Sequence, residues 1–115
     1  MAIDLDIIRE KNKKKVVYIV GSISLDIDSY VEKFAKAEET LRWIGFEMVI
    51  NPTCLPDNLP YRSYAPISIA FVQACDVVYA TEGWEKSIGA QAEVAYAKMA
   101  GKEIIYQGDK NESSL

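Results

Sequence analysis

The chain has 115 residues, a length that predicts one domain with its own hydrophobic core. Half of the residues are hydrophobic, 26% are charged and the net charge is −4, which is an ordinary globular composition without a broad basic surface for a nucleic acid polymer. Because the sequence contains no histidine, it excludes Ser-His-Asp and Cys-His nucleophile pairs, histidine general bases and histidine-ligated zinc. Any chemistry must therefore use carboxylates, tyrosine, hydroxyls, lysine or backbone amides.

The two cysteines and the charged N-terminal segment indicate a cytoplasmic protein. Cys54 and Cys75 are too few for a disulfide framework, so reduced thiols are expected. No apolar run approaches the roughly 18 residues of a membrane span, and no signal peptide is expected before the first strand. Residues 1–14 form a charged lead-in, while the chain from residue 16 onward carries 14 acidic and 8 basic side chains.

Strand-like and helix-like periodicities alternate along the rest of the chain. The predicted strands are short, rich in β-branched residues and bounded by turn-forming residues, whereas the predicted helices have apolar residues every three or four positions. In chain order the elements are strand Lys15–Gly21, helix Asp28–Ile44, strand Phe46–Ile50, helix Ser63–Cys75 with Pro66 in its first turn, strand Asp76–Ala80, helix Ser87–Ala100 and strand Glu103–Tyr106. A polar tail over residues 108–115 follows.

This alternation predicts an α/β fold in which helices cover both faces of a parallel sheet. Right-handed crossovers favour a flavodoxin-like three-layer α/β/α architecture, with four or five parallel strands in the order 2-1-3-4. Ligands of such sheets bind beyond the carboxyl ends of the strands, near the switch between strands 1 and 3. A site is therefore expected among Gly21-Ser22, Asn51-Pro52 and the segment Thr81–Ser87.

The loop after the first strand contains Gly21, Ser22 and Ile23. Glycine permits a tight turn and a close approach of the backbone to an anion, and the serine hydroxyl adds a donor. Neither the G-x-G-x-x-G fingerprint nor the G-K-[ST] phosphate loop is present. An ordinary strand-to-loop turn explains the same residues.

The start of the last predicted helix carries a more informative group of residues. Ser87 is a predicted N-cap, and the exposed amides after it favour an anion. Gly89 costs about 1 kcal/mol relative to alanine in a helix, which suggests that something approaches the backbone closely. Glu93 lies one turn later and has no lysine or arginine three or four residues away, so it is placed to meet a ligand. A solvated surface glutamate is the alternative.

Two aromatic residues and one further acid complete the candidates. Trp84 lies in the loop at the mouth of the expected crevice, where it could stack on a nucleobase or pack as a lid. Tyr18 lies in the first strand, a core position where a buried hydroxyl needs a partner, and Glu93 is one candidate. Asp76 is expected to be a cap or loop anchor at the opposite edge. The carboxylates are not spaced along the sequence as metal ligands are, so no metal is expected.

Five motifs together resemble the nucleoside 2-deoxyribosyltransferase superfamily, in particular its small deoxyribosyltransferase-like bacterial and phage branch. The motifs are VVYIVGSIS, F-x-x-A-E-x-x-L-R-x-x-G-F-x-x-V-x-N-P, A-C-D-V-V-Y, G-W-E-K-S-x-G-A-x-x-E and G-K-E-I-I-Y. The first and fourth motifs are also similar to the deoxynucleoside 5′-monophosphate N-glycosidases. On this resemblance, residues 15–107 form a nucleoside deoxyribosyltransferase-like domain.

The resemblance implies cleavage or transfer at the N-glycosidic bond of a nucleoside or nucleotide, without a cofactor. A glutamate attacks C1′ of the deoxyribose, and water or another base then takes the sugar. Glu93 matches this nucleophile and Tyr18 matches the tyrosine that orients it. Ser22, Ser87 and Gly89 match residues near the 5′ end of the nucleotide, and a serine at position 87 favours a phosphate. The family also implies a homodimer or a larger homo-oligomer.

Three positions depart from the family pattern. Ser68 stands eight residues before Asp76, where the family has an aspartate as its general acid. Ser24 stands where the monophosphate hydrolases have an arginine, and Gln91 replaces the second glycine of S-x-G-x-G-x-E. Loss of a general acid typically lowers a rate by ~10²–10⁴-fold.

These departures raise two questions: which residue could supply the missing acid, and whether the protein is an enzyme. Glu82 or Glu85, on the loop at the crevice, could replace the missing acid. A non-catalytic nucleotide-binding module that keeps the pocket is the first alternative to an enzyme. A small interaction protein with no ligand is the second.

Overall fold

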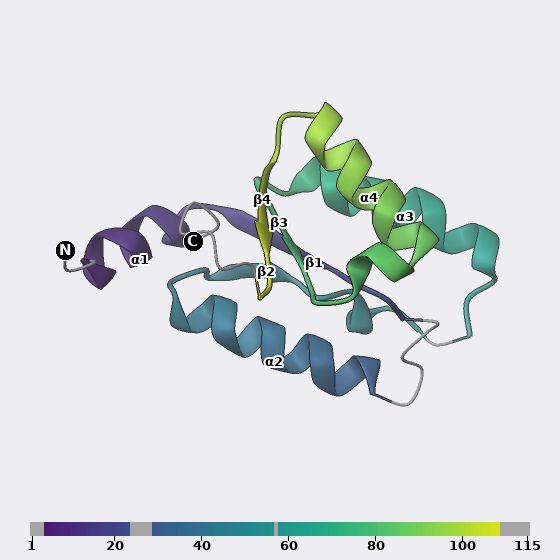
Figure 1. Cartoon of the computed structure of the whole chain (residues 1–115), viewed down its shortest axis with the longest axis horizontal. Coiled ribbons are helices and arrows are strands. Elements are labelled where there is room, and N and C mark those ends of the chain that lie inside the picture. The colour runs from purple at the N-terminus through teal and green to yellow at the C-terminus, as the bar shows by residue number, and fades with distance from the viewer. Residues whose placement is uncertain (1–3, 24–28, 57, 109–115) are drawn as a thin grey trace.

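The computed structural model describes residues 4–23, 29–56 and 58–108, with the side chain of Tyr61 left out. Over these residues the chain forms a four-stranded parallel sheet and four α-helices (Figure 1). The strands are β1 (Val16–Val20), β2 (Met48–Ile50), β3 (Val77–Ala80) and β4 (Glu103–Tyr106). The helices are α1 (Leu5–Lys13), α2 (Tyr30–Trp43), α3 (Tyr61–Ala74) and α4 (Ile88–Met99), with short 3-10 helices at Pro52–Cys54 and Trp84–Lys86.

The strand order β2-β1-β3-β4 confirms the predicted parallel three-layer fold with strand 1 beside strand 3. In the register of the sheet, Tyr18 of β1 lies between Ile50 of β2 and Val78 of β3. Every residue of β3 is buried, as are all residues of β1 after Val16. Strands covered on both faces need apolar side chains on both faces, which is why they read as continuous apolar runs.

Two hydrophobic clusters fill the space between the layers. Helix α2 covers one face of the sheet, while α3 and α4 cover the other (Figure 1). The α2 cluster contains Val17, Ile19, Phe34, Ala37, Leu41, Phe46, Val77, Tyr79 and Ile105. The α3/α4 cluster contains Tyr18, Val20, Val72, Cys75, Val78, Ala80, Ala90, Val94 and Ala97. The side chains of alternate residues along one strand therefore point into opposite clusters.

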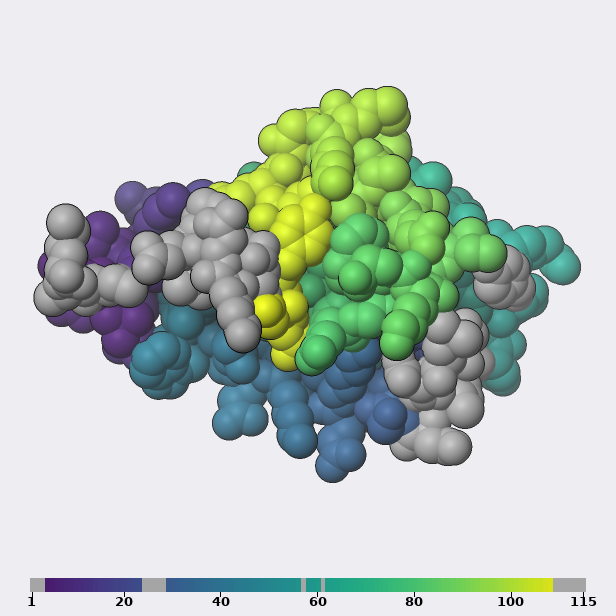
Figure 2. All heavy atoms as spheres, viewed as in Figure 1, coloured from purple at the N-terminus to yellow at the C-terminus, as the bar shows by residue number. Residues whose placement is uncertain are grey.

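Helix α1 occupies the segment for which the sequence predicts only a charged lead-in. The carboxylate of Asp4 caps it by accepting hydrogen bonds from backbone N–H groups of the first turn. Arg9 donates from Nε to the carbonyl oxygen of Trp43 at 2.9 Å and lies over the indole ring. The buried Asn12 donates to the carbonyl oxygen of Ile44 at 2.8 Å. Polar side chains thus attach α1 to the end of α2, and Figure 2 shows it projecting from one end of the molecule.

Several element boundaries differ from the predicted ones for local reasons. Strand β2 begins at Met48 because Phe46 turns into the α2 cluster, and its backbone N–H bonds to the carbonyl of Leu41 at 3.1 Å. Helix α3 begins at Tyr61, so Pro66 lies inside the helix rather than in its first turn. The interpretation of Asp76 as an anchor is confirmed, since its carboxylate accepts a hydrogen bond from the backbone N–H of Val16 at 2.9 Å.

Candidate active site

Tyr18 and Glu93 form a hydrogen-bonded pair, called here the Tyr18–Glu93 pair. Tyr18 projects from the middle of β1 toward α3 and α4, and only 2% of its surface is exposed. Its hydroxyl donates to Oε2 of Glu93, which is 75 residues further along the chain on α4. Glu93 is half-buried, so it faces the interior without being sealed from solvent. The predicted partner of the Tyr18 hydroxyl is confirmed.

Burial controls the electrostatics of this pair. Removal from water raises the pKa of Glu93 from its ordinary value of 4.5 to about 7, although the hydrogen bond from Tyr18 opposes the rise. Burial, and then the nearby charge of Glu93, raises the pKa of Tyr18, so the phenol keeps its proton. Among the described residues no lysine or arginine forms an ion pair with Glu93. Near neutral pH Glu93 therefore exists as both carboxylate and acid.

Helix α3 closes the other side of the Tyr18 ring. The ring of Phe71 lies 5.3 Å from it between centroids, tilted by 52°. The nearby Ser68 side chain lowers the pKa of the Tyr18 hydroxyl. Sequence reasoning missed that Ser68 lies near the pair. The only signal was the resemblance, which marks this position as the family's acid.

The loop after β1 is constrained by packing at Gly21. A Cβ atom added there would lie 2.0 Å from Oγ1 of Thr81 and 2.8 Å from Cε1 of Phe34. The glycine is therefore needed to pack the end of β1 against β3 and α2, as the strand-to-loop interpretation allows. Ser22 is buried and Ile23 is exposed, while Ser24 lies outside the described residues.

The first turn of α4 has space beside its backbone. Ser87 is the predicted N-cap, with its hydroxyl oxygen accepting a hydrogen bond from the backbone N–H of Ala90 at 3.2 Å. A Cβ atom added at Gly89 would meet only Oγ of Ser87, at 3.9 Å. Packing among the described residues therefore gives no reason for a glycine at this exposed position. Gln91, which replaces the family glycine, donates to the backbone carbonyl of Glu85 and ties the preceding loop to α4.

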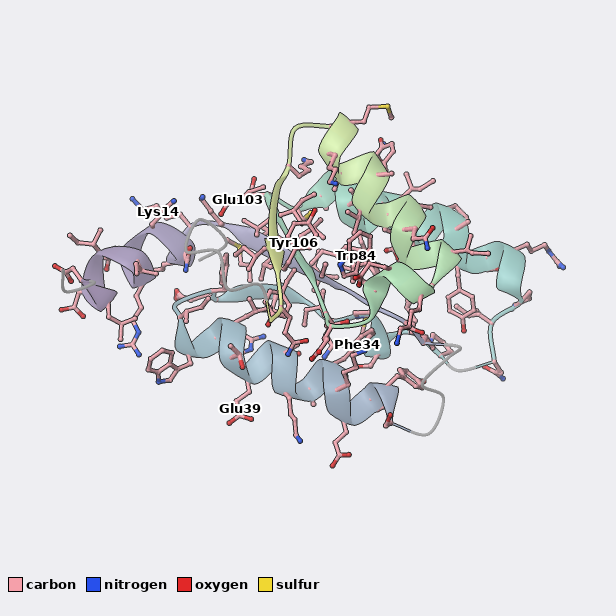
Figure 3. The ribbon with its side chains drawn as sticks, viewed as in Figure 1. Lys14, Phe34, Glu39, Trp84, Glu103 and Tyr106 are labelled. Carbon is pink, nitrogen blue, oxygen red and sulfur yellow. The ribbon has the colours of Figure 1, made fainter. Side chains whose placement is uncertain are left out.

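Trp84 packs against Tyr106 and the α3/α4 cluster. Its ring centroid lies 5.7 Å from that of Tyr106 on β4, and β3 separates β4 from β1 (Figure 3). The indole is half-buried against the α3/α4 cluster, so it packs within the protein, the second of the two roles expected for it. Glu82 and Glu85 flank it with exposed side chains.

Polar contacts also fix the other loops at the carboxyl edge of the sheet. Lys33 of α2 donates to the backbone carbonyl of Glu82 at 2.7 Å, across the end of β3. Asn51 accepts a hydrogen bond from the backbone N–H of Thr53 at 3.0 Å and donates to Glu38 at 3.0 Å. The three predicted loop segments therefore follow β1, β2 and β3 at the carboxyl edge of the sheet, and Asn51 has a structural role there.

The described residues contain neither a cluster of metal ligands nor a helix suited to a membrane. No group of three or more cysteine, aspartate or glutamate side chains is arranged to hold a metal ion within residues 4–23, 29–56 and 58–108. No helix in the described part of the chain is both long and apolar enough to cross a membrane.

The fold and the pair define a parallel α/β domain with one half-buried carboxylate held by a buried tyrosine. A family model described as a domain of unknown function (DUF4406) matches residues 15–106, and the chain belongs to this family. The match begins beside β1 and ends with β4, so α1 lies outside it. No curated protein and no solved structure matches the chain.

Proposed function

We propose that the protein cleaves the N-glycosidic bond of a (deoxy)nucleoside or nucleoside 5′-monophosphate, or transfers its sugar, with Glu93 as the nucleophile. The observation that carries the proposal is the half-buried Glu93 carboxylate, which accepts a hydrogen bond from Tyr18 and has no cationic partner among the described residues. The resemblance of the sequence to nucleoside 2-deoxyribosyltransferases supports the same chemistry.

A carboxylate in this setting suits a sugar substrate. Breaking the bond from C1′ to the base creates positive charge on the sugar, which a nearby carboxylate stabilises or traps as a glycosyl ester. The Tyr18 hydroxyl holds Oε2, which leaves Oε1 of Glu93 to attack C1′. The electron pair of the broken bond goes to the base, which takes a proton from solvent. Water then hydrolyses the ester, or a second base takes the sugar.

The first turn of α4 is the proposed place for the 5′ end of the ligand. The exposed amides of a helix N-terminus favour a phosphate. Gly89 lies about one turn before Glu93, and Ser87 is the N-cap of the same helix. Ser22, Ile23 and Gly21 follow β1 at the same edge of the sheet. No cofactor is needed for this reaction.

The variant Gly89→Ala tests stability and nucleotide binding separately at the first turn of α4. Because the added methyl has room in the protein, the variant is expected to be more stable by about 0.5–1 kcal/mol. The same methyl should weaken nucleotide binding by at least ~10-fold if a phosphate approaches the backbone there. Urea unfolding and titration calorimetry measure the two effects. Unchanged affinity would remove Gly89 from the binding site.

The direct test of the proposal is an assay for free base. Purified protein is incubated with deoxynucleosides, their 5′-monophosphates and the ribose counterparts, with and without a second free base, and products are separated by liquid chromatography. Slow base release from at least one class is expected, because no carboxylic acid stands at the family's position. No product from any of them contradicts the proposal.

Ser68 favours a second candidate, a nucleotide-binding module without catalysis. A serine hydroxyl near Tyr18 stands at the position of the family's acid, and it cannot protonate a leaving base. Saturable binding of a nucleotide without base release would select this candidate. If no nucleotide raises the melting temperature, a small interaction protein without a ligand remains.

We also propose that the chain forms a homodimer or larger homo-oligomer through the outer faces of α3 and α4. Ile69 and Met99 are 44% and 79% exposed on these helices, and such an interface would remove both side chains from water. Light scattering after size-exclusion chromatography should give at least a dimer, and Ile69→Glu with Met99→Glu should give a monomer. Ile7→Glu on α1 is the matched control, and a monomeric wild type contradicts the proposal.

A further inference from the structure

The turn that follows β3 is held by side chains from two other parts of the chain. Residues 81–83 form this segment, called here the 81–83 turn. The backbone carbonyl of Glu82 accepts a hydrogen bond from Nζ of Lys33 on α2 at 2.7 Å. The backbone N–H of the same residue donates to Oε1 of Gln107, which follows β4, at 2.9 Å. Both polar backbone groups of Glu82 are thus fixed from outside the turn.

The residues around Lys33 explain why its ammonium group lies at this turn. Phe34, the next residue of α2, is fully buried, and a Cβ atom added at Gly21 would lie 2.8 Å from its ring, so α2 packs closely on the end of β1 here. A Cβ atom added at Gly83 would lie 3.9 Å from Nζ of Lys33. Gly83 has a φ of 87°, in the left-handed region that favours glycine. Lys33 therefore lies beside the residue that gives the turn its shape.

Hydrogen bonds continue from the 81–83 turn to the start of α4. The backbone N–H of Trp84 donates to the carbonyl of Thr81 at 3.1 Å, and the N–H of Ser87 donates to the carbonyl of Trp84 at 3.1 Å. The side chain of Gln91 donates to the backbone carbonyl of Glu85, within the 3-10 helix Trp84–Lys86. The position of the turn thus determines where the first turn of α4 lies.

From these contacts we infer that Lys33 is a positioning residue, which holds the 81–83 turn and so fixes the first turn of α4. It acts across the sheet, because α2 and α4 cover opposite faces (Figure 1). A hydrogen bond from a charged donor is stronger than one between neutral groups, which suits this task. The effect of Lys33 on a ligand rests on the proposed function, in which this turn of α4 takes the 5′-phosphate. Its effect on the protein itself does not.

The first test is amide hydrogen exchange of the full chain without ligand, followed by NMR. Lys33→Met keeps most of the side chain but removes the donor. It is expected to speed exchange of the backbone N–H groups of Trp84 and Ser87 by about 10-fold, because the turn that supports their acceptors is released. Lys33→Arg, which keeps a charged donor, should restore slow exchange. Lys36→Met, at an exposed position one turn later on α2, is the matched control and should change neither amide.

The same experiment separates positioning from general stability. The N–H of the fully buried Val78 in β3 should keep its wild-type exchange rate in Lys33→Met. Unchanged exchange at Trp84 and Ser87, or an equal acceleration at Val78, overturns the inference. Should Lys33→Met fail to fold, Lys33→Gln gives the same comparison with a shorter and neutral donor.

Kinetics distinguish this inference from the proposed function. If the wild type releases base from a 5′-monophosphate, Lys33→Met should raise KM by about 10-fold with little change in kcat, because Tyr18 holds Glu93 separately. Lys33→Arg should recover the KM, and a deoxynucleoside without phosphate should keep its wild-type KM. An unchanged KM for the monophosphate overturns the link from the turn to the ligand. If the wild type releases no base, the proposed function fails, while hydrogen exchange still decides whether Lys33 positions the turn.

Discussion

Glu93→Gln is expected to lower base release by more than about 10³-fold. The amide oxygen of glutamine can still accept the hydrogen bond from Tyr18, but it is neutral and cannot form the glycosyl ester. The comparison is of initial rates of base release by liquid chromatography. Glu39→Gln is the matched control, because Glu39 is exposed on α2, on the opposite face of the sheet (Figure 3). Equal rates for wild type and Glu93→Gln would contradict the assignment of the nucleophile.

The same variant should be more stable than the wild type at alkaline pH, which excludes misfolding as the cause of lost activity. The pKa of Glu93 is raised in the folded protein from 4.5 to about 7, so the folded state holds its proton more tightly. The associated stability is present below pH 4.5 and is lost as the pH rises to about 7. The rise in the pKa from 4.5 to about 7 corresponds to roughly 3 kcal/mol of unfolding free energy. Urea unfolding at pH 5 and pH 8 should show the loss in the wild type alone.

Gly21→Ala is expected to lower the free energy of unfolding by about 1–3 kcal/mol or more. The new methyl would overlap Oγ1 of the fully buried Thr81 and the ring of Phe34, so the ends of β1 and β3 must separate. Urea unfolding measures the change. Gly89→Ala is the control, because its methyl has room. Wild-type stability in Gly21→Ala would show that the loop relaxes freely and that the glycine serves another purpose.

Strand order and layers could be predicted because burial on two faces leaves a strong signal. The run from Val16 to Val20 is apolar at every position, and every residue after Val16 is buried. Boundaries were less predictable where one side chain decides them. In the sequence, Phe46 extends the apolar run of β2 toward the N-terminus. In the structure its side chain packs in the α2 cluster, and β2 begins only at Met48.

Helix α1 could not be predicted from an apolar stripe, because polar side chains hold it. Arg9 and Asn12 bond to backbone carbonyls of Trp43 and Ile44, which lie more than 30 residues away in sequence. No local pattern encodes such contacts. The one local signal was Asp4, whose position before the helix is typical of an N-cap.

The Tyr18–Glu93 pair could be predicted in part, and Ser68 could not. A tyrosine inside an apolar strand needs a partner, and a glutamate without a local cation is a plausible one. Ser68 lies near Tyr18 because it is three residues before Phe71, whose ring contacts Tyr18. The rotation of α3 about its axis depends on packing of the whole helix, which sequence periodicity specifies only coarsely.

The two faces of the sheet have different surroundings, because alternate residues of β1 point into different hydrophobic clusters. Both clusters contain a buried tyrosine, Tyr79 on the α2 side and Tyr18 on the α3/α4 side, but only Tyr18 is hydrogen-bonded to a carboxylate among the described residues. Substitutions in α3 and in the first turns of α4 therefore change the surroundings of Glu93, whereas substitutions in α2 act on the other hydrophobic cluster. If the proposed function holds, substrate preference can change through one layer of the fold while the other layer continues to stabilise it.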